Sequence, residues 1–301
     1  MQKFTKVFKE ETLRLISLIL ITVSFYSFAC NIEGTRGIAP ENDLWIGPEV
    51  DAESNINKEQ FLAIIKDVED VYAPIIKKMK ATLVIQKAWD DGTVNAYATR
   101  QGSNWIVKMF GGLARHKLIT PDGFALVVCH EIGHHIGGAP KKGFRWASNE
   151  GQSDYWGTAK CLRKVYMDED NEEIVKKLNV PKLVVDTCTK QFTAKADQFM
   201  CQRSAMAGLS LGSLLNSLGR SSTPVKFDTP DTNVVARTNH NHPAGQCRLD
   251  TYYQGALCDI DENEDVSQSN EETGVCYRNN GAKMGTRPLC WFKPAKLPSQ
   301  F

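Results

Sequence analysis

Residues 129–140, CHEIGHHIGGAP, constrain the fold of this 301-residue chain more than any other segment. The Pro-Asp-Gly run at 121–123 is typical of a helix start, and the glycines at 137 and 138 are typical of a helix end. Apolar residues recur every four positions between these signals: Phe124, Val128, Ile132 and Ile136. His130 and His134 lie on the opposite face, about 200° around the helix axis. The sequence therefore predicts a helix between a hydrophobic core and a cleft.

The same helix carries a metal-binding pattern. His130 and His134 share one face because they are four residues apart, so both rings can reach one ion. Glu131 lies beside them in the His-Glu-x-x-His order, whose glutamate is the general base of metallopeptidases. At ordinary composition this five-residue pattern occurs by chance in on the order of 1% of chains of this size. Further residues must therefore support a metal site.

The segment SNEGQSDYW that follows can supply a third ligand. Ser148 or Asn149 can cap a second helix, on which Glu150 and Asp154 point to one side because they are four residues apart. If this helix returns antiparallel to the first, Glu150 completes a His-His-Glu site for one zinc ion, Zn2+. Asp154 can then accept the free ring N–H of a ligand histidine, most simply His130. The alternative is a pair of exposed acids on a solvated helix.

Strand patterns precede the metal-binding helix. Residues 58–80 have the apolar spacing of an amphipathic helix, with Pro74 as an expected kink. Residues 81–89, 93–100 and 105–113 are predicted strands separated by polar turns. The predicted fold class is α+β, and the family resemblance of the motifs described below implies that it is gluzincin metallopeptidase-like. It is mainly helical, with a small antiparallel sheet beside the metal-binding helix and a disulfide-stapled C-terminal region.

Taken in order, the motifs resemble the HtpX-like family of gluzincin zinc metallopeptidases, which includes prenyl-protein proteases and periplasmic lipoproteins. That family has Asn-Ala on a strand, Gly-Leu, His-Glu-x-x-His, Glu-x-x-Ala-Asp, and a late His-Pro with a downstream Arg. This chain has the counterparts in the same order over roughly residues 60 to 250: Asn95-Ala96, Gly112-Leu113, the helix motif, Glu150 to Asp154 with Ser153 in place of the alanine, His242-Pro243, and Arg248.

The resemblance implies roles that spacing alone does not give. His242 is expected to help stabilise the oxyanion formed during peptide hydrolysis, and Arg248 to support the site. His240 and Tyr155 are alternative donors, and the His-Pro segment can also be a surface turn. Asn95-Ala96 is expected to be the strand edge on which an extended substrate pairs antiparallel.

The N-terminus predicts export. Four basic residues precede the uncharged run LISLILITVSFYSFA: Lys3, Lys6, Lys9 and Arg14. A basic start, an apolar run and the small residue Ala29 are typical of a secretory signal, and the run is short for a membrane span of roughly 20 residues. SFAC also resembles a lipobox, in which Cys30 becomes the lipidated first residue. Plain cleavage nearby, or an uncleaved anchor, is the alternative.

Cysteine parity also favours an exported chain. Nine cysteines less Cys30 leave eight: Cys129, Cys161, Cys188, Cys201, Cys247, Cys258, Cys276 and Cys290. An even number allows up to four disulfides, whose connectivity the sequence does not give. Cys129 adjoins His130, so either a disulfide there ties down the metal helix or a buried thiol packs beside it.

These features predict a signal at 1–30, a linker at 31–56, a zinc metallopeptidase domain at 57–254 and a Cys-rich extension at 255–301. The net charge of +1 favours no nucleic-acid partner. The predicted function is a zinc endopeptidase of the bacterial cell envelope, either periplasmic, an outer-membrane lipoprotein or secreted. Its substrates would be polypeptides, as in envelope protein quality control. The alternative is a noncatalytic envelope lipoprotein whose structural zinc site supports an assembly or interaction factor.

Overall fold

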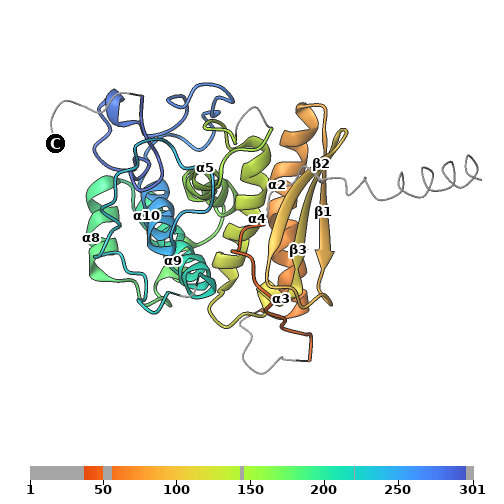
Figure 1. Ribbon diagram of the computed structural model, residues 1–301. Coiled ribbons are helices and arrows are strands. Elements are labelled where there is room, and N and C mark those ends of the chain that lie inside the picture. The colour runs from red at the N-terminus through yellow and green to blue at the C-terminus, as the bar shows by residue number, and fades with distance from the viewer. Residues whose placement is uncertain (1–36, 50–55, 143–145, 220, 296–301) are drawn as a thin grey trace, which may run out of the picture. The chain divides into compact units, whose positions relative to one another are not determined.

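The computed structural model describes residues 37–49, 56–142, 146–219 and 221–295, which belong to one compact unit. The predicted signal at 1–30, including Cys30, lies outside these residues. A three-stranded sheet lies at one side of this unit, with α2 and α4 beside it (Figure 1). The second half of the chain forms helices on the other side, α8, α9 and α10, with the C-terminal segment above them.

Helix α2, Lys58–Lys78, begins where its sequence provides a complete cap. Asn57 accepts a hydrogen bond from the Gln60 backbone N–H, and the Gln60 side chain accepts one from the Asn57 N–H. The helix continues through Pro74 as one element. Its buried residues follow the predicted spacing and pack against strand β1 and helix α4: Phe61, Ile65, Val68, Tyr72 and Ile76.

The sheet consists of β1 Thr82–Ala88, β2 Ala96–Gln101 and β3 Asn104–Phe110, in the order β1-β3-β2. The predicted hairpin between β2 and β3 is confirmed, with Gly102 at φ +59° in its turn. The prediction of a wholly antiparallel sheet is wrong, because β1 pairs with β3 in parallel. The apolar strand β3 takes the central position, and the chain crosses from β1 to the far edge before it enters β2.

Helix α4, Pro121–Ile136, has the predicted boundaries. Thr120 accepts a hydrogen bond from the Gly123 N–H at its start, and Gly137 ends it. The helix is buried on all sides from residue 123 to residue 136, so its histidine face does not border open solvent. Helix α5, Glu150–Trp156, covers that face, and the helices approach closely at Gly133, where a Cβ would lie 3.1 Å from the Trp156 ring.

The chain beyond α5 completes the core. After a π-helical turn, Gly157–Cys161, the remaining helices are α6 Leu162–Val165, α7 Asn171–Val175, α8 Lys182–Gln191, α9 Lys195–Leu218 and α10 Gly245–Ala256, while α3 Gly111–Ala114 follows β3. A 3-10 turn spans Arg278–Asn280. None of the described helices combines the length and the apolar character needed to cross a membrane.

Four disulfides are present among the described residues: Cys129–Cys161, Cys188–Cys201, Cys247–Cys290 and Cys258–Cys276. The last four cysteines pair with one another, so the predicted stapled C-terminal region is confirmed. Cys129–Cys161 ties α4 to the π-helical turn, which resolves the alternatives for Cys129. Four disulfides indicate folding in an oxidising compartment outside the cytosol.

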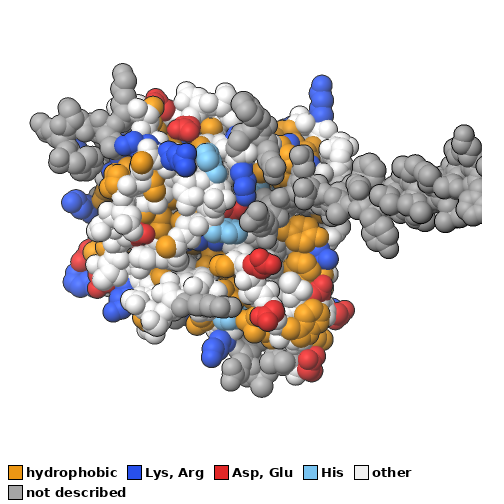
Figure 2. All heavy atoms as spheres, in the orientation of Figure 1, with side chains coloured by type: hydrophobic (Ala, Val, Ile, Leu, Met, Phe, Trp, Pro, Cys, Tyr) orange, Lys and Arg blue, Asp and Glu red, His pale blue; other side chains and the backbone are white. Residues whose placement is uncertain are grey.

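Two predicted domain boundaries differ from the packing. Part of the predicted linker at 31–56 is buried in the main core, because Ile38, Ala39 and Ile56 contribute apolar side chains to it. The predicted extension at 255–301 shares a hydrophobic cluster with α5, which includes Trp291 of the extension and Tyr155 of α5. The face in Figure 2 carries both basic and acidic side chains.

Candidate metal centre

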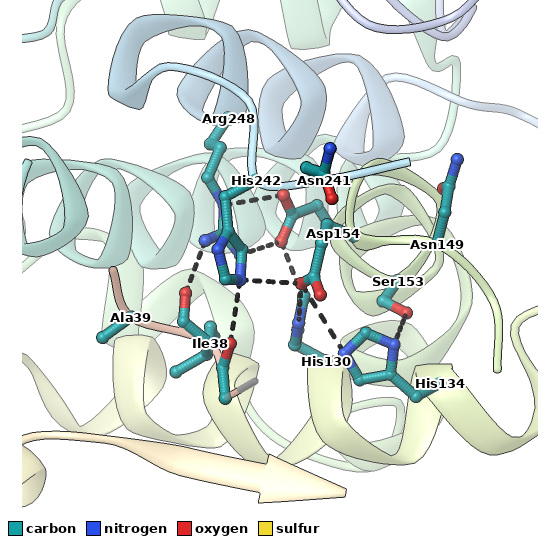
Figure 3. A network of polar contacts seen from close by, with 12 residues as sticks. Ile38, Ala39, His130, His134, Asn149, Ser153, Asp154, Asn241, His242 and Arg248 are labelled. Carbon is teal, nitrogen blue, oxygen red and sulfur yellow. Dashed lines mark hydrogen bonds and ion pairs between the residues drawn. The ribbon is translucent and has the colours of Figure 1, made fainter. Parts of the chain in front are cut away.

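Three side chains from two helices meet at a group that can hold a metal ion. His130 and His134 extend from α4, and Glu150 is the first residue of α5. Glu150 Oε2 lies 3.3 Å from His130 Nε2 and 3.7 Å from His134 Nε2. The three side chains are at most 1% exposed. The three side chains that the sequence predicts as ligands are therefore grouped together, and Figure 3 shows His130 and His134 among them.

The residues fit a cation on two observations. His134 Nε2 is buried without a hydrogen-bond partner among the described residues, and buried Glu150 Oε2 has only ion-pair contacts with imidazole nitrogens. Leaving such atoms unsatisfied costs about 1–3 kcal/mol each, more for a charged group, and coordination removes that cost. Moreover, a tetrahedral ion with ligands at about 2.0–2.1 Å places its ligand atoms about 3.3–3.4 Å apart. The two distances to Glu150 are close to this value.

Hydrogen bonds behind the rings fix the histidine tautomers. His134 Nδ1 lies 2.9 Å from the Ser148 carbonyl oxygen and 3.0 Å from Ser153 Oγ. Because a carbonyl oxygen only accepts, Nδ1 carries the proton and Nε2 presents its lone pair to the site. His130 Nδ1 lies 2.7 Å from Asp154 Oδ1, which has the same effect. Asp154 thus occupies the position that its spacing from Glu150 predicts.

Asp154 is the centre of a buried network. Arg248 donates to both of its oxygens, at 2.8 and 2.7 Å, and Tyr252 Oη donates to Oδ1 at 2.7 Å. Burial alone would raise the pKa of Asp154, but Arg248 and His130 lower that pKa to about 2. Tyr252 was not predicted, although its position four residues after Arg248 on α10 places both on one helix face.

Glu131 is the acid without a partner. Both of its oxygens are buried, and neither has a hydrogen-bond partner among the described residues. Burial raises the pKa of Glu131 to about 8, with Glu150 adding to the rise and His130 opposing it. A carboxyl group held unpaired beside a metal-ligand set is poised to exchange a proton.

Electrostatics in the cluster favour a cation. Burial lowers the pKa of His134 to about 4, which keeps its imidazole neutral. Burial would raise the pKa of Glu150, but the nearby histidines hold it well below its usual range. Arg248 is the buried positive group facing the carboxyls of Asp154 and Glu150. Burial would lower the pKa of His130, but Asp154 and Glu150 raise it to about 9. A divalent ion in the group would therefore replace the proton on His130.

His242 reaches the site from the segment before α10. Its Nε2 lies 2.8 Å from the Gly37 carbonyl oxygen and 3.2 Å from Glu150 Oε2. Because the carbonyl only accepts, this nitrogen carries a proton and acts as a donor. The alternative donors lie elsewhere. His240 is 3.3 Å from the Asn149 amide, and the Tyr155 hydroxyl donates to the Gly285 carbonyl.

Asn95 and Ala96 lie at the edge of the sheet, where β2 begins. The chain's own residues occupy this edge: Ile38 N–H donates to the Ala96 carbonyl at 2.9 Å, and Ala39 N–H donates to Asn95 Oδ1 at 3.1 Å. The sequence did not predict this pairing, because residues 31–56 were interpreted as a linker.

Replacing His134 with alanine is expected to weaken metal binding by more than about 100-fold, since even residues that only orient metal ligands contribute about 10–100-fold. His135→Ala is the matched control. The His135 ring stacks between Trp105 and Trp146, with centroids 5.4 and 4.8 Å away, so it is not part of the ligand group. Equilibrium dialysis with zinc measures both variants, and equal losses in the two would contradict the assignment of His134 as a ligand.

Comparison of the chain with protein-family models, curated proteins and solved structures finds no match in any of the three. A functional assignment therefore depends on the residues of the site.

Proposed function

We propose that this protein is a zinc-dependent metalloendopeptidase, of the gluzincin type that its motifs resemble. The observation that supports the proposal most is the combination of a three-ligand group with an unpaired acid beside it, Glu131. Two nitrogen ligands and one carboxylate suit zinc, whereas calcium and magnesium prefer oxygen ligands alone. Three protein ligands leave a coordination position for a substrate, as catalytic zinc sites require.

A zinc ion held by His130, His134 and Glu150 would polarise the scissile carbonyl as a Lewis acid and would lower the pKa of water toward neutrality. Glu131 takes the proton from the attacking water and delivers it to the leaving amine. The Nε2–H of His242 donates to the oxygen that becomes negative in the tetrahedral intermediate. Asp154 holds the His130 ring in the required tautomer, and Arg248 in turn holds Asp154.

The proposed setting is the bacterial cell envelope, with polypeptide substrates and a role in protein quality control. Four disulfides support a location outside the cytosol. The signal-like N-terminus and the SFAC segment support either a lipid anchor on Cys30 in the periplasm or outer membrane, or release after cleavage.

One observation favours a second candidate function, a structural zinc site in a noncatalytic envelope factor. The ligand side chains are at most 1% exposed, as in sites that only stabilise a fold. However, a structural site gives no role to a buried acid without a partner, and burying such a group is costly. The endopeptidase is therefore the better-supported proposal.

Chelator treatment separates the two functions. The purified protein is expected to cleave fluorescent casein, to lose this activity with 1,10-phenanthroline, and to regain it when zinc but not magnesium is added. Elemental analysis before and after treatment measures the zinc content. A protein that binds one zinc ion, unfolds less readily with it, and cleaves nothing in any form would support the structural role instead.

A further inference from the structure

The metal-ligand group is closed by the chain itself. Glu131 and the three ligand side chains are no more than 1% exposed, so an extended substrate cannot reach them in this arrangement. Ile38 and Ala39, which lie beside His242 and Arg248 in Figure 3, are also buried, at 0% and 1% exposure. The covering segment, residues 37–39, comes from the part of the chain before the first described helix.

The covering segment lies along the sheet edge and makes one backbone hydrogen bond to it, from Ile38 N–H to the Ala96 carbonyl, while its backbone bends at residues 38 and 39. Besides its bonds to Asn95 and Ala96, the chain continues antiparallel to residues 92–96. Ile46 N–H donates to the Gly92 carbonyl at 2.8 Å, and Trp45 forms an antiparallel bridge with Thr93. Backbone pairing of an extended segment with an exposed sheet edge is a common mode of peptide recognition. This segment therefore takes the place in which a substrate would pair.

The other side of the covering segment engages the groups assigned to the site. The Gly37 carbonyl accepts from His242 Nε2 at 2.8 Å, and the Ile38 carbonyl accepts from Arg248 Nη1 at 2.7 Å. His242 is the donor expected to bind the substrate oxygen, so the Gly37 carbonyl already occupies it. A substrate needs both the edge and this donor, and residues 37–39 hold both.

We propose that residues 37–39 are an internal occupant of the peptide-binding edge, and that the peptidase is latent until this segment leaves. The proposal rests on the proposed function, because it assigns the edge and His242 to substrate binding. Displacement of residues 37–39 opens the metal group to solvent and frees the His242 donor. The segment competes with substrates in the same chain, so activity depends on the fraction of molecules in which it is released.

Gly37→Val is the displacing variant. Gly37 has φ +88°, and a Cβ there would lie 2.7 Å from the Ala96 carbonyl oxygen and closer still to Asn95 Oδ1. The matched control is Gly102→Val in the β2–β3 turn. Gly102 also has a positive φ, +59°, but a Cβ there meets no atom within 4 Å. Both substitutions strain the backbone, and only the first pushes the chain off the edge.

Two readouts test the proposal in the zinc-loaded full chain. If residues 37–39 are bound to the edge in at least about nine of ten molecules, at most about one molecule in ten is open to substrate. Gly37→Val, which releases the segment, should therefore raise casein cleavage about tenfold or more. Zinc transfer to a coloured chelator should accelerate similarly in Gly37→Val, while Gly102→Val matches the parent protein. A synthetic peptide with the sequence GIAPENDLWI, residues 37–46, should inhibit Gly37→Val in trans.

The outcomes separate this proposal from the proposed function. If Gly37→Val and its control release zinc and cleave casein at the parent rate, residues 37–39 do not restrain the enzyme, although the peptidase assignment stands. If no form cleaves casein while each binds zinc, the peptidase assignment fails, and latency fails with it. Should circular dichroism show that Gly37→Val is unfolded, Ala39→Pro replaces it, because proline lacks the N–H that donates to Asn95.

Discussion

Replacing Glu131 with glutamine is expected to lower kcat for casein by about 10²–10⁴-fold, the usual contribution of a positioned general base. Glutamine keeps the volume of the side chain but cannot take a proton from water. Zinc content should be unchanged, because Glu131 is not one of the three grouped ligands. Turnover in the Gly37→Val background, together with elemental analysis of zinc, measures both effects.

Asp250→Asn is the control for the loss of a carboxylate from a buried position. Asp250 lies on α10 and accepts hydrogen bonds from the Asp231 N–H and the Gln246 side chain, away from the metal group. This variant should retain the parent turnover. Full proteolysis by Glu131→Gln would remove the general base from the mechanism, and loss of zinc from it would make Glu131 a ligand.

Replacing Asp154 with asparagine is expected to reduce the free energy of unfolding of the metal-free protein by about 3–5 kcal/mol. The change leaves Arg248 charged and buried without its carboxylate partner, which is the costly way to break a buried ion pair. It also withdraws the charged acceptor from His130 Nδ1, so zinc affinity should fall about 10–100-fold. Urea unfolding and zinc titration measure the two effects.

The matched control is Asp186→Asn, which breaks the ion pair with Lys182 on the surface of α8. Exposed pairs contribute little to stability because water and salt screen them, so this variant should unfold at the parent urea concentration. Equal stability of the two variants would show that the network around Asp154 is not a structural support of the site.

The helix boundaries and the ligand spacing of the metal centre could be predicted from the sequence, because they depend on residues within a few helical turns of one another. Pro121 and Gly137 delimit α4, and Asn149 caps α5 by accepting from the Gln152 N–H, one of the two caps expected. Helical periodicity then places His130 and His134 on one face. These relations follow from short-range hydrogen bonding and helix geometry.

Longer-range relations were predicted less well. The sheet was expected to be antiparallel because β1, β2 and β3 are joined by short turns, yet β1 pairs with β3 in parallel. The alternation of side chains along a strand predicts which face of the strand is buried, but it does not predict which strands pair. Strand pairing depends on how the whole sheet packs against the core. The hydrogen bond from Tyr252 to Asp154 was likewise not predicted, because it depends on the packing of α10 against α5.

The sequence by itself determined the ligand types, their helical spacing, the proline start of α4, the cap of α5 and the even number of cysteines. Tertiary structure decided which cysteines pair, how close Glu150 lies to the two imidazoles, and that residues 37–39 cover the edge at Asn95. The physical reason is that the first set depends on neighbouring residues along a helix. The second set depends on contacts between distant segments, which are formed when buried polar groups and apolar side chains find partners across the whole fold.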